Sequence, residues 1–247
     1  MVSAVGMRKM GSFIAAGRYF ALIVFLAGGF CSAVFVRHVV AQSLDALKVE
    51  AGQGDAQAQY HLGVMLYDNA RGALRDYPEA AKWFRQAAAQ GHALAQYNLG
   101  VMYYRGEGTP RDYAEAAKWF RQAATKGYAL AQYNLGVMYY RGEGALRDSA
   151  EAAKWFRQAA TQGYALAQYY LGVMYYNGEG VPRDYVEAYM WFSLAAAQGD
   201  ADARKNLDLT ETLLTREQRA EAAEDGARVE TAIRVPAALI LQNAERF

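Results

Sequence analysis

Residues 91–126 read GHALAQYNLGVMYYRGEGTPRDYAEAAKWFRQAATK, and this stretch decides the fold because the chain repeats it. Residues 127–162 read GYALAQYNLGVMYYRGEGALRDSAEAAKWFRQAATQ, and residues 163–198 read GYALAQYYLGVMYYNGEGVPRDYVEAYMWFSLAAAQ. The period is 36 residues, and a further unit that starts at Gly54 matches with one extra residue in its loop. Self-similarity at such a period is typical of repeat architectures. We therefore assign residues 54–199 to four tandem repeats.

The first half of each repeat predicts a helix that is apolar on two sides. A helix of this kind must be packed between neighbours on both sides, as in a stack of repeats. Gly100 flanks one of the apolar stripes, where its missing side chain lets another helix come close. Gly106 and Gly108 then supply the conformational freedom that a C-terminal cap and a turn need. The two stripes of residues 93–105 are Ala95, Leu99, Met102 and Tyr103, and Tyr97, Val101 and Tyr104.

The second half of each repeat predicts a helix with one apolar face. Asp112 is its expected N-cap, and Glu115 stands three residues later, as in a capping box. Lys118 and Arg121 point to solvent. No repeat can bury its stripes alone, so neighbouring repeats must stack into one continuous core. The apolar face of this helix is Tyr113, Ala116, Ala117, Phe120, Ala123 and Ala124, with Trp119 at its margin.

The order A-x-A-Q-Y-x-L-G, G-x-G, D-x-x-E-A, W-F and A-A-x-x-G resembles the Sel-one-like repeat (SLR), a relative of the tetratricopeptide repeat. The resemblance covers about three-fifths of the chain. It implies an all-α fold, a right-handed solenoid of helix-turn-helix pairs whose first helices line the concave side. Members of that family serve mostly as adaptors for protein complexes, often at membranes or in the bacterial envelope. The resemblance therefore implies a protein or peptide partner.

Helical caps are expected at both ends of the repeats. Residues 42–53 predict an N-terminal cap helix that starts at Ser43. Residues 200–247 predict C-terminal capping helices and a tail, and residues 200–208 look like a truncated first helix. The fourth repeat carries apolar or small residues, among them Met190 and Leu194, where its siblings are charged or polar. Something must cover that face, and we expect a helix that starts with a capping pair at Thr215 and Gln218 and runs to about Arg234, leaving the tail 236–247 unplaced.

Residues 1–41 predict a signal peptide or a transmembrane signal anchor. Three basic residues precede an uncharged apolar stretch over residues 19–36, which is short for a span and long for a signal peptide core. Cleavage after Ala41 and retention as an inner-membrane anchor both stay open. A lipoprotein anchored at Cys31 is disfavoured by Phe30, which is large for the position before a lipidated cysteine. Each alternative places the repeats outside the cytoplasm, in the periplasm or another compartment of the cell envelope.

Nothing in the sequence predicts catalysis, a metal or a cofactor. The formal net charge of +1 lacks the basic footprint of a nucleic-acid-binding protein. No cysteine follows Cys31, so disulfides and cysteine metal sites are excluded from the repeats. The recurring Asp-x-x-Glu pairs stand at helix starts, where capping explains them. His61 and His92 occupy variable positions and are expected to be surface variants. We expect no enzyme and no small-molecule substrate.

The concave face is the expected binding surface for an extended peptide or protein segment. Asparagine amides can clamp a peptide backbone, and arginine can hold a carboxylate through two hydrogen bonds. Leu94, Leu130 and Leu166 border the candidate residues. The alternative is that these side chains are ordinary solvent-facing polar groups. The candidates are one row of His61, Asn98, Asn134 and Tyr170, and a second row, seven residues further along each helix, of Arg105, Arg141 and Asn177.

Two other functions compete with a binding scaffold. Some secreted relatives are associated with binding or cleaving β-lactam and cell-wall compounds, but paired cysteines define those members and this sequence lacks them. A passive structural spacer is the third possibility. It predicts no partner and no sensitivity to changes on the concave face.

Overall fold

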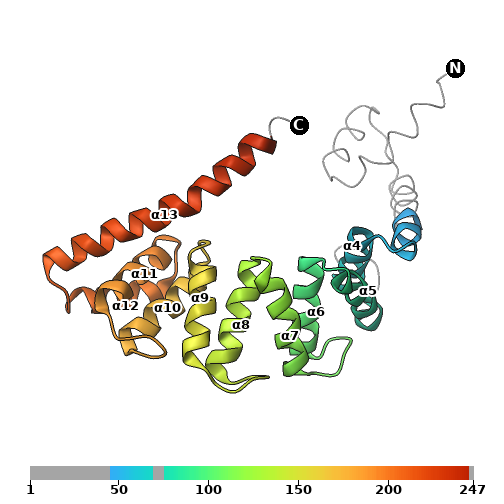
Figure 1. Cartoon of the computed structure of the whole chain (residues 1–247), viewed down its shortest axis with the longest axis horizontal. Coiled ribbons are helices and arrows are strands. Elements are labelled where there is room, and N and C mark those ends of the chain that lie inside the picture. The colour runs from blue at the N-terminus through green and yellow to red at the C-terminus, as the bar shows by residue number, and fades with distance from the viewer. Residues whose placement is uncertain (1–44, 69–74, 245–247) are drawn as a thin grey trace, which may run out of the picture. The chain divides into compact units, whose positions relative to one another are not determined.

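The computed structural model of the chain describes residues 45–68 and 75–244, and within these ranges it contains helices and no strand. The helices follow one another as antiparallel pairs in a row (Figure 1). This confirms the expected all-α solenoid of helix pairs. The first helices are α4 (Ala56–Tyr67), α6 (Ala93–Arg105), α8 (Ala129–Arg141), α10 (Ala165–Asn177) and α12 (Ala201–Glu211). The second helices are α5 (Tyr77–Ala89), α7 (Tyr113–Thr125), α9 (Ser149–Ala160) and α11 (Tyr185–Ala197), and a long helix α13 (Arg216–Ala244) closes the chain.

The expected leader, residues 1–41, lies outside the described residues, as does Ser43. No helix within the described ranges has both the length and the apolar character that crossing a bilayer requires. The repeats and the helices after them belong to one compact unit that begins at Ala51. Residues 45–52 are helical. Ala51 is buried, and its carbonyl oxygen accepts a hydrogen bond from the side chain of Gln59 in the first repeat.

Aspartates start the second helices, as the sequence predicts. The Oδ1 atom of each accepts from the backbone amide three residues later, at 3.0 Å for Asp112 and at 2.9 to 3.1 Å for its equivalents. The reciprocal half of the expected capping box is wrong. The Asp112 amide donates instead to the Tyr103 carbonyl oxygen of the first helix, at 2.9 Å, and the Glu115 carboxylate bonds to Lys118, one helical turn away. Glu187 has no such lysine and accepts from the indole nitrogen of Trp191 at 2.8 Å.

A phenylalanine beneath a glycine joins the two helices of each repeat. Phe120 is 2% exposed, and a Cβ atom built on Gly100 would lie 2.7 Å from its ring. Only glycine allows this approach, which confirms the role expected for Gly100. The same pairing recurs in every repeat, as Gly63 with Phe84, Gly136 with Phe156 and Gly172 with Phe192.

The Gly-x-Gly loops connect neighbouring repeats. Gly142 has left-handed backbone angles and caps the C-terminus of α8. Gly144, also with positive φ, lies so close to the preceding repeat that a Cβ atom would be 2.3 Å from the carbonyl oxygen of Tyr113. The backbone of each loop therefore packs against the first turn of a second helix, the one that belongs to the preceding repeat.

Helix α13 covers the apolar face of the fourth repeat. Met190 and Leu194 on α11 are 5% and 6% exposed. A Cβ atom built on Gly226 of α13 would lie within 4 Å of both side chains, so the two helices pack closely here. The amide of Thr215 donates to Gln218 Oε1 at 2.9 Å and the amide of Gln218 donates to Thr215 Oγ1 at 3.3 Å, so the expected capping pair is confirmed.

The expected end of this last helix at about Arg234 is wrong, since α13 continues to Ala244. Pro236 removes one amide donor, but a single proline does not have to end a helix when strong helix formers follow. The segment AALILQNA supplies them.

Candidate binding surface

The repeat places the candidate residues in two rows along the first helices. His61, Asn98, Asn134 and Tyr170 occupy one position on α4, α6, α8 and α10, and all are half-buried. Arg105, Arg141 and Asn177 are exposed at the last residues of α6, α8 and α10. Of the bordering leucines, Leu166 is 41% exposed.

Two members of the first row contact aromatic side chains of the preceding repeat. Asn134 Nδ2 donates to the Tyr97 hydroxyl at 3.5 Å, and the Tyr170 ring stacks on Phe156 with centroids 5.3 Å apart. Burial raises the pKa of Tyr97. Asn134 and Tyr170 therefore help to join repeats. Asn98 differs, because its amide has no hydrogen-bond partner among the described residues.

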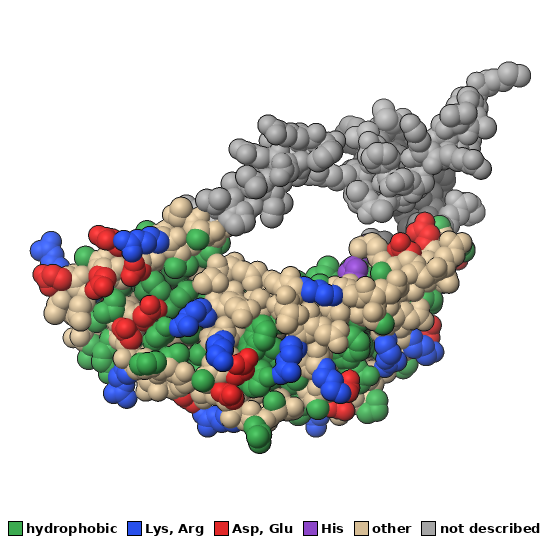
Figure 2. All heavy atoms as spheres, in the orientation of Figure 1, with side chains coloured by type: hydrophobic (Ala, Val, Ile, Leu, Met, Phe, Trp, Pro, Cys, Tyr) green, Lys and Arg blue, Asp and Glu red, His purple; other side chains and the backbone are tan. Residues whose placement is uncertain are grey.

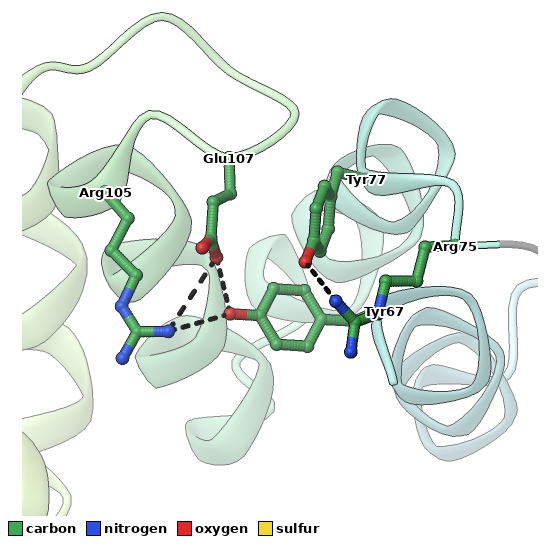
Figure 3. A network of polar contacts seen from close by, with 5 residues as sticks. All are labelled: Tyr67, Arg75, Tyr77, Arg105 and Glu107. Atoms are coloured by element: carbon green, nitrogen blue, oxygen red, sulfur yellow. Dashed lines mark hydrogen bonds and ion pairs between the residues drawn. The ribbon is translucent and has the colours of Figure 1, made fainter. Parts of the chain in front are cut away.

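Arg105, in the second row, belongs to a polar network between two repeats (Figure 3). The Tyr67 hydroxyl donates to Glu107 Oε2 at 2.6 Å, and Arg105 Nη1 donates to the same hydroxyl at 3.2 Å. Arg105 lies 3.9 Å from the Glu107 carboxylate. Burial, followed by the hydrogen bond to Glu107, raises the pKa of Tyr67 to about 12. The Tyr67 hydroxyl therefore stays protonated and keeps donating.

This network recurs along the solenoid. Tyr104 donates to Glu143 at 2.8 Å, with Arg141 3.9 Å from that carboxylate. Tyr140 donates to Glu179 at 3.0 Å, and because Asn177 replaces the arginine there, Arg147 pairs with Glu179 instead. The arginines predicted to receive a partner's carboxylate thus already face carboxylates of this chain. The side chains of Arg105 and Arg141 are still 58% and 53% exposed.

A ladder of glutamines forms a third connection, which the sequence analysis missed. Its rungs, Gln59, Gln96, Gln132 and Gln168, are 1% to 3% exposed, and each donates to a backbone carbonyl eight residues earlier at 3.0 to 3.1 Å. The Oε1 atoms of three rungs accept from a glutamine at the end of the next second helix, at 2.6 to 2.8 Å. These donors are Gln90, Gln162 and Gln198.

Lys126 interrupts the ladder at the rung of Gln96. It stands where the other repeats carry the donating glutamine, and its ammonium group bonds to the Gly91 carbonyl instead. The buried Oε1 atom of Gln96 is left without a hydrogen-bond partner. A buried acceptor without a donor destabilises the folded state.

Replacing Lys126 by glutamine is therefore expected to stabilise the protein. The new amide completes the ladder, and we expect a gain of about 1 kcal/mol in the free energy of unfolding. Urea denaturation followed by circular dichroism measures it. Lys118→Gln, in the same helix but on its solvent face, is the control and should leave the midpoint within about 0.5 kcal/mol. A lower midpoint for Lys126→Gln than for the parent contradicts the ladder.

His61 and His92 belong to a chain of hydrogen bonds between the first two repeats. His92 is the N-cap of α6, and its Nδ1 atom accepts from the Ala95 amide at 3.2 Å. Its Nε2 atom therefore carries the proton and donates to Gln57 Oε1 at 3.0 Å. Gln57 Nε2 in turn donates to His61 Nε2 at 2.8 Å. His92 is thus a helix cap as well as the surface variant expected from the sequence.

Stability should fall in mild acid because of His92. Burial, and then the nearby His61 and Lys126, lower the pKa of His92. The unfolded chain therefore binds more protons in the window below the ordinary histidine pKa of about 6.5. The stability that neutral His92 contributes is fully present above that pH and is lost as the pH falls through the lower folded value.

His92→Tyr, which copies Tyr128 and Tyr164 of the later repeats, is the comparison variant. Between pH 7.5 and 5, the parent should lose about 1 kcal/mol more than the variant, the usual contribution of an N-cap. Urea midpoints at both pH values measure the difference. Equal losses in the two proteins would show that the cap does not titrate.

Comparison with known proteins agrees with this architecture. The model of the Sel1 repeat matches residues 56–92, 93–128, 129–164 and 165–200. A search of curated proteins gave no match. Among solved structures, a protective antigen present in uropathogenic Escherichia coli strains, which displays an SLR fold, is 47% identical with a TM-score of 0.62. The alignment covers 65% of this chain and 34% of the antigen, so this chain spans about a third of that protein's length.

A Sel1 repeat protein from Oxalobacter formigenes is 34% identical with a TM-score of 0.63. Its alignment covers 67% of this chain and 68% of that one. Sel1 repeat proteins are generally protein-interaction scaffolds and are typically non-catalytic. Four matched repeats that fill more than half of the sequence show that the chain belongs to the Sel1 repeat family.

Proposed function

We propose that this protein is an adaptor of the cell envelope that holds an extended segment of a partner protein against its first helices. The observation that carries the proposal is the open amide of Asn98. It is half-buried in the middle of the row, and none of the described residues bonds to it. A side-chain amide in this state offers one acceptor and two donors, the complement of a peptide backbone.

Apolar surface beside the row supports the same function. Leu166 is 41% exposed on α10, one helical turn before the half-buried Tyr170. Interfaces commonly combine exposed apolar and aromatic side chains with a few polar groups that set the register. A segment with apolar side chains at intervals suits this surface.

The envelope location rests on the leader. Residues 19–36 are apolar and follow basic residues, so the repeats are exported whether the leader is cleaved or kept. Retention anchors the repeats at the inner membrane, and cleavage releases them into the periplasm. The size of the mature protein, determined by mass spectrometry, distinguishes the two.

Comparative capture tests the adaptor. The tagged full chain and its double variant Asn98→Ala, Asn134→Ala are captured from detergent-solubilised cells, and the co-purifying proteins are quantified. Tyr170 is left unchanged because its ring packs on Phe156. The control variant Lys82→Ala, Lys118→Ala changes two exposed residues of the second helices.

We expect the double variant to capture at least about tenfold less of one partner protein, which corresponds to about 1.4 kcal/mol of binding free energy. The control should retain that partner. Equal capture by all three proteins would show that the first row does not bind the partner, and would favour a passive structural spacer.

A further inference from the structure

Three residues that differ from their equivalents in the other repeats lie together at the joint, the contact between the first and second repeats. His61, His92 and Lys126 stand where the other copies carry Asn or Tyr, Asp or Tyr, and Gln respectively. They come from α4, from the N-cap of α6 and from the C-cap of α7. Gln57 bridges the two histidines, and the Lys126 ammonium group bonds to the carbonyl oxygen beside His92. Three of the positions at which the copies differ thus lie together at one place.

The joint gathers positive or protonatable groups. His61 comes from α4 and Lys126 from α7, and burial, followed by the charges of these two groups, lowers the pKa of His92. Asp55 caps α4, with its carboxylate bonded to the Ala58 amide at 2.6 Å. On the surface, histidine and a basic side chain lie close together along the upper rim of the repeats (Figure 2).

Lys126 weakens the folded state where it stands. Its ammonium group replaces the amide that the ladder requires, and Gln96, only 2% exposed, keeps an unpartnered oxygen atom. The glutamine of the other repeats would avoid this defect. A residue that destabilises its own joint while adding a cation to it is better explained by binding than by packing.

We propose that His61, His92 and Lys126 form a binding site for a side-chain carboxylate of an acidic segment of the partner protein. The acidic segment as the source of that carboxylate rests on the proposed function. Lysine and protonated imidazole both donate charge-assisted hydrogen bonds to carboxylates. His61 also belongs to the first row, so a segment held along that row reaches this site at its end. Binding is expected to strengthen in mild acid, where protonation of His92 adds a positive charge to the site.

A labelled peptide tests the site on the full chain in detergent. The probe is an acetylated and amidated hexapeptide of alternating glycine and aspartate, and its asparagine counterpart is the neutral control. Fluorescence anisotropy at pH 5.5 and 7.5 gives the dissociation constants. We expect the acidic probe to bind about tenfold more tightly at pH 5.5, and the neutral probe to show no pH dependence.

The chain supplies its own matched variants. Lys126→Gln and His92→Tyr introduce residues that other repeats carry, so the fold is preserved, and each should weaken the acidic probe at pH 5.5 by about tenfold. Lys118→Gln removes a lysine from the same helix and should leave binding unchanged. For Lys126→Gln, weaker binding is expected together with higher stability, a combination that damage to the fold cannot produce.

Two results overturn the proposal. One is unchanged binding of the acidic probe by Lys126→Gln. The other is displacement of the probe by acetate or inorganic phosphate at equal concentration, which would show a site for small anions only. Binding along the first row is tested independently by the double variant Asn98→Ala, Asn134→Ala. If the double variant loses the partner while Lys126-dependent binding of the probe is intact, both proposals are supported. If it captures the partner normally with that binding intact, only binding along the first row is refuted.

Discussion

Replacing Gly144 by alanine is expected to destabilise the protein by about 4 kcal/mol or more, at the upper end of what single substitutions do. Two effects add. Gly144 has φ of +73°, and left-handed backbone costs a residue with a Cβ atom about 1 to 2 kcal/mol. The new Cβ atom would also lie 2.3 Å from the carbonyl oxygen of Tyr113 and 2.4 Å from its carbonyl carbon. Both atoms are backbone, so relief requires two repeats to move apart.

Gly127→Ala is the matched control for this substitution. Gly127 has φ of +87°, but a Cβ atom there would meet nothing within 4 Å. It should therefore show the cost of the left-handed backbone alone, about 1 to 2 kcal/mol. Urea midpoints of the two variants isolate the steric contact between repeats by difference. Equal midpoints would mean that the loop is free to shift and that it does not fix the spacing of the repeats.

Helix positions could be predicted from the sequence because the signals for them are local. The three- and four-residue spacing of apolar residues, the aspartate caps and the glycines after the first helices act within one repeat. The extension of α13 past Arg234 was missed because Pro236 is a strong local stop signal, which the helix formers after it outweigh. The reciprocal half of the capping box failed because the Asp112 amide, which Glu115 would accept from, already donates to the Tyr103 carbonyl oxygen of the first helix.

The contacts between repeats could not be predicted in the same way. Position along the first helices was enough to place Asn98 and Arg105 in rows. It did not show that Glu107 neutralises Arg105, because that carboxylate reaches back from the loop to Tyr67 in the preceding repeat. A signal did exist. The tyrosine and glutamate that bond are 39 or 40 residues apart at every joint, one period plus a helical turn.

Differences between copies proved the most informative feature of the sequence once the structure showed where they meet. His61, His92 and Lys126 are 31 and 34 residues apart in sequence, and each looks like an isolated variant. Only the stacking of α4, α6 and α7 brings them to one joint, where Gln57 and Gly91 connect them. In a repeat protein, positions that are the same in every copy form the contacts that all neighbouring repeats share. Positions that differ between copies and lie together in space mark a site with its own chemistry.

Phe156→Ala is expected to cost about 3 to 5 kcal/mol, the usual range for a buried phenylalanine. The side chain is completely buried beneath Gly136, and its ring also stacks on Tyr170. Gly136→Ala alone should destabilise by about 1 to 3 kcal/mol through overpacking, since the new Cβ atom would lie 2.8 Å from the ring.

A double-mutant cycle decides whether these two residues act as one packing unit. With the ring removed, the alanine at position 136 no longer meets an obstacle and fills part of the cavity, and it removes a helical glycine. The double variant should therefore be at least as stable as Phe156→Ala alone, a coupling of about 1 to 3 kcal/mol. Additive losses in urea denaturation would mean that the helices separate at this point when the glycine is replaced. The close approach of helix pairs would then depend on something other than the phenylalanine beneath the glycine.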